Sequence, residues 1–71
     1  MNEKNFIEDL EEILNVEESL TMETNLDDLE EWESLTALMF QSFVYKATGK
    51  APEPADIAKA KTVKDLYEFV K

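Results

Sequence analysis

The sequence predicts a small all-α fold, a four-helix bundle with three main helices, one short helix and a long first loop. Apolar residues recur at helical spacing near both ends of the chain, and a dense apolar segment lies between them. No segment keeps the alternation of apolar and polar residues that is typical of a strand. We expect residues 1–71 to form a single domain, because a chain of 71 residues can bury only one core.

The first helix is expected to begin near Phe6, after a polar stretch, Met1–Asn5, that is expected to fray. Its apolar residues form one stripe along the helix: Phe6, Ile7, Leu10, Ile13 and Leu14. Acidic residues fill the opposite, solvent-facing side. Asn15–Val16 ends the helix.

Residues 17–33 keep no helical period, and a loop of this length in a small domain is uncommon unless it is pinned or functional. We expect pinning, by three leucines that reach the core: Leu20, Leu26 and Leu29. A short helical turn at Leu26–Leu29, capped by Asn25 or Thr24, fits this segment. Trp32, near the end of the loop, can be a partly buried plug or a docking residue.

The second helix is expected to begin at or just after Ser34 and to end near Thr48. Its apolar residues cover much of the circumference: Leu35, Ala37, Leu38, Met39, Phe40, Phe43, Val44, Tyr45 and Ala47. Gly49 is the only glycine and fits a terminating position that needs a positive φ.

Two groups of side chains on this helix have different expected roles. Leu35 and Leu38 are expected to begin its packed face. Met39 and Tyr45 can belong to the core or to an exposed face that meets a partner. The predicted core draws on three helices: Phe6, Leu10, Leu38, Val44, Leu66 and Val70.

Pro52 and Pro54 mark the connection that follows, and Asp56–Ala60 can form one or two helical turns. Thr62 is the predicted N-cap of the last helix, with Asp65 completing a variant capping box. The apolar residues of that helix follow at steps of three, four and seven, with one more beside them: Val63, Leu66, Tyr67, Val70 and Phe69.

The composition excludes several classes of function. The chain has 17 Asp and Glu against 7 Lys, for a net charge of -10, which excludes binding to a nucleic-acid backbone and favours basic protein partners. It has no cysteine and no histidine, which excludes thiol metal sites and Ser-His or Cys-His catalysis. No signal peptide and no membrane-spanning segment is seen, so we expect a cytoplasmic monomer without membrane insertion.

Ser34 lies where an acidic run meets the apolar helix. A serine before such a helix is typically an N-cap. The same position presents its hydroxyl to the positive end of the helix dipole, which suits a phosphate, so Ser34 is also a candidate for covalent attachment.

The acidic run itself does not predict a metal site. Its carboxylates lack the ligand spacing and the glycine of a calcium-binding EF-hand loop: Asp27, Asp28, Glu30, Glu31 and Glu33. Nothing in the sequence supplies the cleft that paired carboxylates would need for glycoside hydrolysis.

Over nearly its full length the chain resembles the acyl carrier protein family. The resemblance rests on Glu33-Ser34-Leu35 opening a helix, on Gly49 at its end, and on Lys61–Leu66 starting the last helix. The run Leu29–Leu35 looks like the Trp-Asp-Ser-Leu version of the family motif.

This resemblance implies a protein that is not an enzyme. Ser34, flanked by Glu33 and Leu35, would be esterified by 4′-phosphopantetheine, which a phosphopantetheinyl transferase takes from coenzyme A. The terminal thiol of that group would then carry acyl intermediates as thioesters. Leu35 and Leu38 would border the entry to any acyl cavity. A chain with no cysteine has no thiol of its own, so the cofactor would supply the reactivity.

The chain departs from the family pattern in two places. Glu33 stands where the family usually has Asp. The candidate exposed face of the second helix carries no acid: Thr36, Met39, Gln41, Ser42, Tyr45 and Lys46. We therefore expect a specialised carrier that meets acyl-loading and acyl-processing enzymes through these residues: Glu30, Glu31, Trp32, Met39 and Tyr45.

Two alternatives stay open. One is an aminoacyl or peptidyl carrier on the same fold, against which the acidic approach to Ser34 argues. The other is an unmodified acidic helical interaction module. The acyl group and the pathway, whether fatty-acid, polyketide or another, are not indicated by the sequence.

Overall fold

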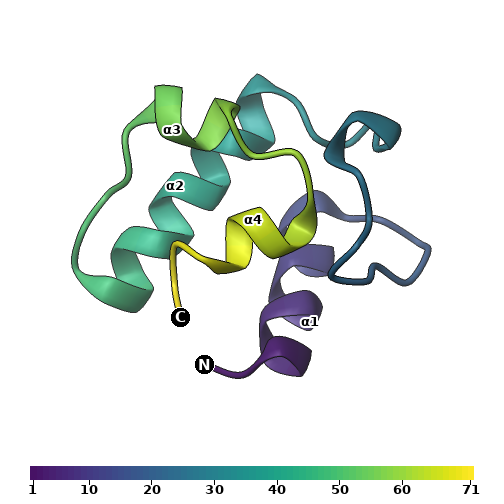
Figure 1. Ribbon diagram of the computed structural model, residues 1–71, viewed down its shortest axis with the longest axis horizontal. Coiled ribbons are helices and arrows are strands. Elements are labelled where there is room, and N and C mark those ends of the chain that lie inside the picture. Colours follow the sequence, from purple (N-terminus) through teal and green to yellow (C-terminus); the bar gives the residue numbers. More distant parts are fainter.

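The computed structural model describes all 71 residues as a helical bundle without strands (Figure 1). Its elements are α1 (Glu3–Leu14), a 3₁₀ turn η1 (Leu26–Asp28), α2 (Ser34–Thr48), α3 (Pro54–Ala58) and α4 (Val63–Tyr67). The predicted all-α bundle, with four helices and a long first loop, is confirmed.

Helix α1 begins earlier than predicted. The side chain of Asn2 accepts a hydrogen bond from the backbone N–H of Asn5 at 2.8 Å, so the helix starts at Glu3. The prediction that the whole stretch Met1–Asn5 frays is therefore wrong. At the other end Asn15 takes the left-handed conformation, with φ 55°, and ends the helix where the sequence indicated.

The long loop between α1 and α2 is pinned by its side chains, as predicted. Its three leucines are all buried: Leu20, Leu26 and Leu29. The predicted turn forms as η1, with Asn25 in the cap position but without a side-chain hydrogen bond. The N–H of Leu20 also donates to a carboxylate oxygen of Glu11 at 2.8 Å, which ties the loop to α1.

Backbone hydrogen bonds join this loop to the start of α4, far away in the sequence. The N–H of Leu26 donates to the carbonyl of Lys61 at 2.8 Å. In the other direction, Val63 donates to Thr24 at 3.1 Å, and Lys64 donates to Met22 at 2.9 Å. The loop thus satisfies N–H groups of the first turn of α4, which a helix leaves without partners of its own.

Helix α2 has the predicted bounds, and Gly49 ends it with φ 82°. Its buried face is formed by Phe40 and Val44, with Ala37 and Phe43 partly buried beside them. Leu35 and Leu38 lie on the opposite side and are exposed, so their assignment to the packed face, and of Leu38 to the core, is wrong.

Aromatic rings fill the centre of the core. Phe40 is fully buried and lies 6.0 to 6.2 Å, centroid to centroid, from four other rings: Phe6, Trp32, Phe43 and Phe69. Of the predicted core residues, five are buried: Phe6, Leu10, Val44, Leu66 and Val70. Such close packing leaves little space for another group inside the bundle.

Helix α3 is a single turn that starts two residues earlier than predicted. Pro54 takes the first helical position, where its missing N–H costs nothing and its fixed φ suits the helix. Ile57 is buried against the core. The side-chain amide of Gln41 donates to the carbonyl of Pro52 at 2.7 Å, which holds the connecting loop against α2.

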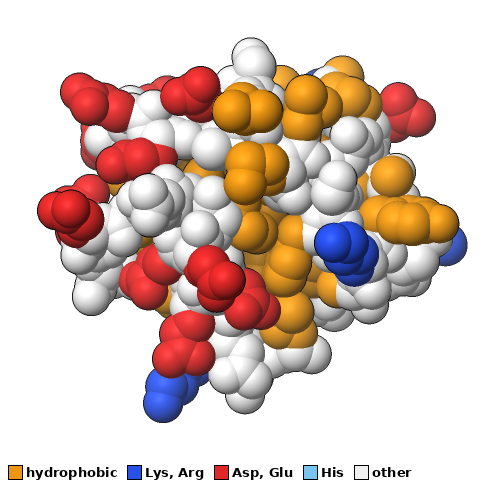
Figure 2. Space-filling model, turned by 180° about the vertical axis from the view of Figure 1, so that it is seen from behind, with side chains coloured by type: hydrophobic (Ala, Val, Ile, Leu, Met, Phe, Trp, Pro, Cys, Tyr) orange, Lys and Arg blue, Asp and Glu red, His pale blue; other side chains and the backbone are white.

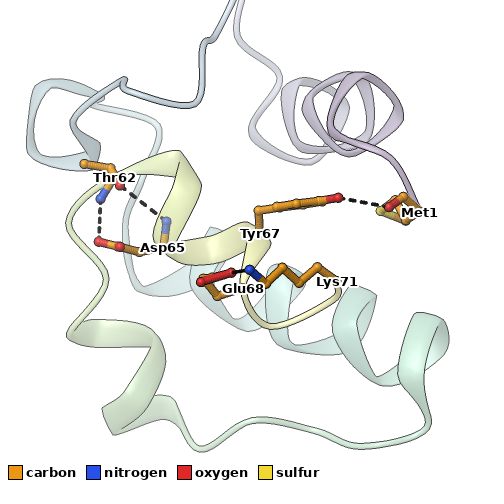
Figure 3. Close-up of polar contacts among 6 residues, drawn as sticks. All are labelled: Met1, Thr62, Asp65, Tyr67, Glu68 and Lys71. Carbon is orange, nitrogen blue, oxygen red and sulfur yellow. Dashed lines mark hydrogen bonds and ion pairs between the residues drawn. The ribbon is translucent and has the colours of Figure 1, made fainter.

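The start of α4 is closed by the predicted capping box (Figure 3). The N–H of Asp65 donates to the hydroxyl oxygen of Thr62 at 3.3 Å, and the N–H of Thr62 donates to the Asp65 carboxylate at 3.1 Å. The N–H of Lys61 donates to the same carboxylate at 2.9 Å. These backbone donors, Lys61 first, hold the pKa of Asp65 below its ordinary value.

The two ends of the chain meet at the far end of α4. The hydroxyl of Tyr67 donates to the carbonyl of Met1 at 3.1 Å (Figure 3). The chain then continues in turns, which place Val70 in the core.

Candidate functional site

Ser34 is the first residue of α2, and Glu33 occupies the N-cap position. The predicted capping role of Ser34 is therefore wrong. Thr36, the third residue of the helix, forms part of a capping box: its hydroxyl accepts from the N–H of Glu33 at 2.9 Å and donates to the carbonyl of Glu31 at 2.6 Å. The chain just before the helix is thus fixed without any contribution from Ser34.

This arrangement leaves the hydroxyl of Ser34 free. Ser34 is exposed, and no side-chain hydrogen bond of the structure involves it. The backbone N–H groups of Ser34 and Leu35 also have no acceptor within the protein. Free N–H groups at the positive end of a 15-residue helix favour a negative group such as a phosphate.

Beside Ser34, an open groove of about 470 Å³ runs between α2 and α3. Most of its lining is apolar, with Glu33, Ser34 and Gln41 as the polar members: Trp32, Glu33, Ser34, Ala37, Leu38, Gln41, Pro54, Ile57 and Ala58. The groove has the size and the mostly apolar character of ligand pockets in proteins. Ser34 therefore stands at the edge of a space that can accept an apolar group.

Several lining residues were not predicted from the sequence. Ala37 and Gln41 follow Ser34 at steps of three and seven, so they share its side of the helix with Leu38, which was expected at the entry. That spacing could have identified them. The α3 residues Ile57 and Ala58 could not be placed there without knowing how α3 packs on α2.

The exposed face of α2 is apolar. Four large side chains are between 45% and 63% exposed: Leu35 63%, Leu38 54%, Met39 45% and Tyr45 57%. Leu38 also lines the groove, as expected of a residue at its entry, whereas Leu35 does not. Of the two readings that the sequence left open for Met39 and Tyr45, the exposed face is the one that forms.

Acidic side chains surround the approach to Ser34. Glu30 and Glu33 are exposed, and Glu31 is partly buried beside a polar depression that it shares with Glu17 and Glu18. On the face drawn in Figure 2, hydrophobic side chains form a band between a group of acidic side chains and a lysine. Acidic and apolar surfaces thus adjoin each other on this molecule.

Trp32 has features of both roles that the sequence left open. It is partly buried, and its ring meets that of Phe40 edge to face, with centroids 6.1 Å apart and an interplanar angle of 72°. The same side chain lines the groove beside Ser34. Trp32 therefore connects the core to the candidate site.

Two kinds of feature are absent from the structure. No group of three or more Asp, Glu, His or Cys side chains is placed to hold a metal ion. No helix combines the length and the apolar character needed to cross a membrane. The predicted site residues that the structure brings together are Ser34, Glu33 and Trp32, whereas Met39 and Tyr45 lie on the neighbouring apolar face.

Comparison of the chain with protein-family models, with curated proteins and with solved structures finds no match.

Proposed function

We propose that this protein is a carrier that holds acyl intermediates on a 4′-phosphopantetheine group attached to Ser34. One observation carries the proposal: an exposed serine hydroxyl with no hydrogen-bond partner starts the longest helix, next to free N–H groups and an apolar groove. A serine that served only as a cap would have its oxygen engaged with the backbone.

The residues around Ser34 fit such a group. The Ser34 oxygen would hold it covalently, and the N–H groups of Ser34 and Leu35 suit the phosphodiester charge. The groove lined by Ala37, Leu38 and Ile57 offers apolar surface to whatever the group carries. When bound, the group supplies a thiol for thioester chemistry, which a chain without cysteine cannot supply.

The attachment step is a simple substitution at phosphorus. The hydroxyl oxygen of Ser34 forms the new bond to the pantetheine-linked phosphorus of coenzyme A, the P–O bond of the pyrophosphate bridge to that phosphorus breaks, and adenosine 3′,5′-bisphosphate leaves. The hydroxyl proton passes to a base of the separate transferase, because no side chain of this protein accepts a hydrogen bond from Ser34. The protein itself contributes position and exposure, and it is not an enzyme in this reaction.

Partner enzymes would recognise the surface around the attachment point. The acidic approach at Glu30 and Glu31 attracts basic patches and speeds encounter. Met39 and Tyr45 add apolar area on the adjoining face of α2. Docking would thus combine an acidic loop with an apolar face of α2, which differs from docking through a charged helix. It favours a specialised set of loading and processing enzymes.

Intact-mass analysis tests the proposal directly. The protein is incubated with coenzyme A and a broad-specificity phosphopantetheinyl transferase, beside a known carrier protein. We expect the mass of one phosphopantetheine to be added, and we expect no addition to Ser34→Ala. Ser42→Ala, another exposed serine of α2, is the matched control and should be modified normally. An unmodified wild-type chain beside a fully modified control carrier would overturn the proposal.

The unmodified interaction module is the second candidate, and the exposed apolar face of α2 favours it. Such a face fits a permanent partner as well as a succession of enzymes. Native protein isolated without the added mass, but in a stable stoichiometric complex, would support this candidate. Loading by an adenylating enzyme, in place of an acyl-loading one, would instead indicate an aminoacyl or peptidyl carrier.

A further inference from the structure

We propose that this chain pairs with a second copy of itself through the exposed face of α2, with the two helices antiparallel across a two-fold axis at Ser42. The pair is a weak, concentration-dependent dimer, in place of the monomer expected from the sequence. The proposal concerns the surface of α2 and holds whether or not Ser34 carries a group.

The exposed residues of α2 are spaced as in the seam between two helices. Leu35, Leu38, Ser42 and Tyr45 follow one another at alternating steps of three and four, and all four are exposed. Gly49 ends the row after one more step of four. This is the spacing with which the side chains of one helix fit between those of another. The row follows the whole 15-residue helix, which is about 22 Å long.

The row matches itself when the second copy runs in the opposite direction. A two-fold axis at Ser42 places each residue opposite the one equally far beyond Ser42 in the other copy. Met39 then faces Tyr45 of the second copy, and a thioether beside an aromatic ring is a favourable contact. Leu35 faces Gly49, which has no side chain to obstruct it. The small Ser42 side chains meet at the axis, where they allow a short distance between the helices.

The charges of the chain favour the same pairing. All 17 acidic residues lie outside residues 34–52, and this segment carries only two charges, Lys46 and Lys50. The face of α2 can therefore approach its own copy without bringing acidic side chains together at the centre of the contact. Antiparallel order places Lys50 opposite Ser34 of the second copy, beside Glu33. Parallel order would instead place the two acidic approaches side by side.

The face has the composition of an interface but not the size of a permanent one. Methionine and tyrosine are enriched at the centres of interfaces, where charged residues are depleted. Stable complexes bury about 800 Å² on each partner. The large apolar side chains of this face are only about half exposed, so they supply part of that area. We therefore expect a dissociation constant of about 0.1–1 mM.

Pairing has a consequence for the proposed function. It covers Met39 and Tyr45, which are the residues of α2 proposed to meet partner enzymes. The dimer and an enzyme complex would therefore exclude each other. Because the dimer is weak, an enzyme that binds more tightly displaces the second copy.

Sedimentation equilibrium of the Ser34→Ala chain tests the pairing. This variant lacks the proposed attachment point, so the result does not depend on the proposed function. The measurements run from about 10 μM to about 2 mM, a range that includes the expected dissociation constant. The average mass should rise with concentration from 8.2 kDa towards twice that value.

Two variants that add the same charge form a matched pair. Met39→Glu places a carboxylate within the seam and should weaken the dimer about tenfold or more, because the charge loses its hydration there. Ala55→Glu places it at an exposed position of α3 and should leave the dissociation constant within about twofold of the parent value. Both positions are exposed in the single chain, so both variants should keep the helical circular dichroism of the parent. Tyr45→Ala, which removes the ring opposite Met39, should also weaken the dimer.

Single cysteines report the direction of the two helices. The chain has no cysteine, so Ser42→Cys and Leu35→Cys each introduce its only thiol. In the antiparallel pair the two thiols at position 42 meet, whereas those at position 35 lie at opposite ends of the seam. Under mild oxidation Ser42→Cys should form the disulfide-linked dimer about tenfold faster than Leu35→Cys, because its thiols have the higher effective concentration.

The outcomes distinguish this proposal from the proposed function. A mass of 8.2 kDa at every concentration would overturn the dimer. A dimer that persists unchanged in Met39→Glu and Tyr45→Ala would use another face and would also overturn the proposal. Equal crosslinking of Leu35→Cys and Ser42→Cys would overturn the antiparallel order. A wild-type chain that accepts no phosphopantetheine, but forms the dimer, would overturn the carrier function alone.

Discussion

Helices α2 and α4 begin in contrasting ways. At α4 the first N–H groups all have acceptors: Val63 donates to Thr24, Lys64 to Met22 and Asp65 to the Thr62 hydroxyl. At α2 the N–H groups of Ser34 and Leu35 have none. The start of α4 is closed by the rest of the protein, whereas the start of α2 leaves donors and a hydroxyl available to another molecule.

Both helix starts use a threonine in a capping box, but at different positions: Thr62 is the N-cap of α4, whereas Thr36 is the third residue of α2. The Thr62 hydroxyl accepts an N–H from inside its helix. The Thr36 hydroxyl instead accepts from Glu33, which precedes the helix. Thr36 therefore fixes the approach to Ser34 without engaging Ser34. Four predictions test whether the start of α4 serves stability and the start of α2 serves function.

The largest loss of stability among these changes is expected for Thr62→Ala. Removing the acceptor for the Asp65 N–H should cost about 1 kcal/mol, as for other cap residues, and lower the thermal midpoint by about 4–8 °C. Urea unfolding measures the free energy. Ser42→Ala, which removes an exposed hydroxyl without a hydrogen bond, is the control. An unchanged midpoint would mean that the cap of α4 is dispensable.

Acidification should weaken the same end of α4. Backbone donors lower the pKa of Asp65 in the folded protein, so its contribution to stability is full above the unfolded value of about 4. This stabilisation is lost as the pH falls from the pKa of Asp65 in the unfolded chain towards its lower pKa in the folded protein. The measurement is the difference in unfolding free energy between wild type and Asp65→Asn, which should shrink below about pH 4. A difference that is constant from pH 7 to pH 3 would contradict this role.

A smaller loss is expected for Thr36→Val at the start of α2. Valine keeps the shape but removes the acceptor for Glu33 and the donor to Glu31. Because water can reach these groups, we expect a cost of about 0.5 kcal/mol. The rate of attachment at Ser34 should fall as the approach loosens, and time-resolved intact mass measures it. An attachment rate equal to that of wild type would show that the hydrogen bonds of Thr36 do not contribute to attachment at Ser34.

The smallest effect on stability is expected for Ser34→Ala. The lost hydroxyl makes no hydrogen bond, and alanine is the better helix former, so the unfolding free energy should stay within about 0.5 kcal/mol of wild type. Thermal and urea unfolding are the measurements. A loss above about 1 kcal/mol would identify Ser34 as a structural cap and remove the contrast between the two helix starts.

Much of the fold was predictable because the signals are local. The stripe on α1, the end of α2 at Gly49, and the Thr62–Asp65 cap each depend on residues a few positions apart. The leucines of the long loop were also predicted to be buried, since nothing else in a polar segment would explain them. Ser34 was predicted as the candidate site residue from the same kind of local pattern.

Other features depend on long-range packing and were missed. Helix α2 is apolar around much of its surface, so its pattern could not show that Phe40 and Val44, rather than Leu35 and Leu38, face the core. Serine is a usual N-cap residue, and the sequence did not show that Glu33 would take the N-cap position of α2 instead. The walls of the groove come from two helices that meet only in the folded chain.

The backbone bonds between the long loop and α4 have a consequence for motion. The amides of Leu26, Val63 and Lys64 lie outside the helical ladders, yet each is held by a carbonyl from a distant part of the chain. Hydrogen exchange at these amides requires the loop and α4 to separate, so they should exchange together, as one cooperative unit. The long loop, although it has no regular structure, would then open no more easily than α4. The approach to Ser34 would be rigid on the timescale of hydrogen exchange.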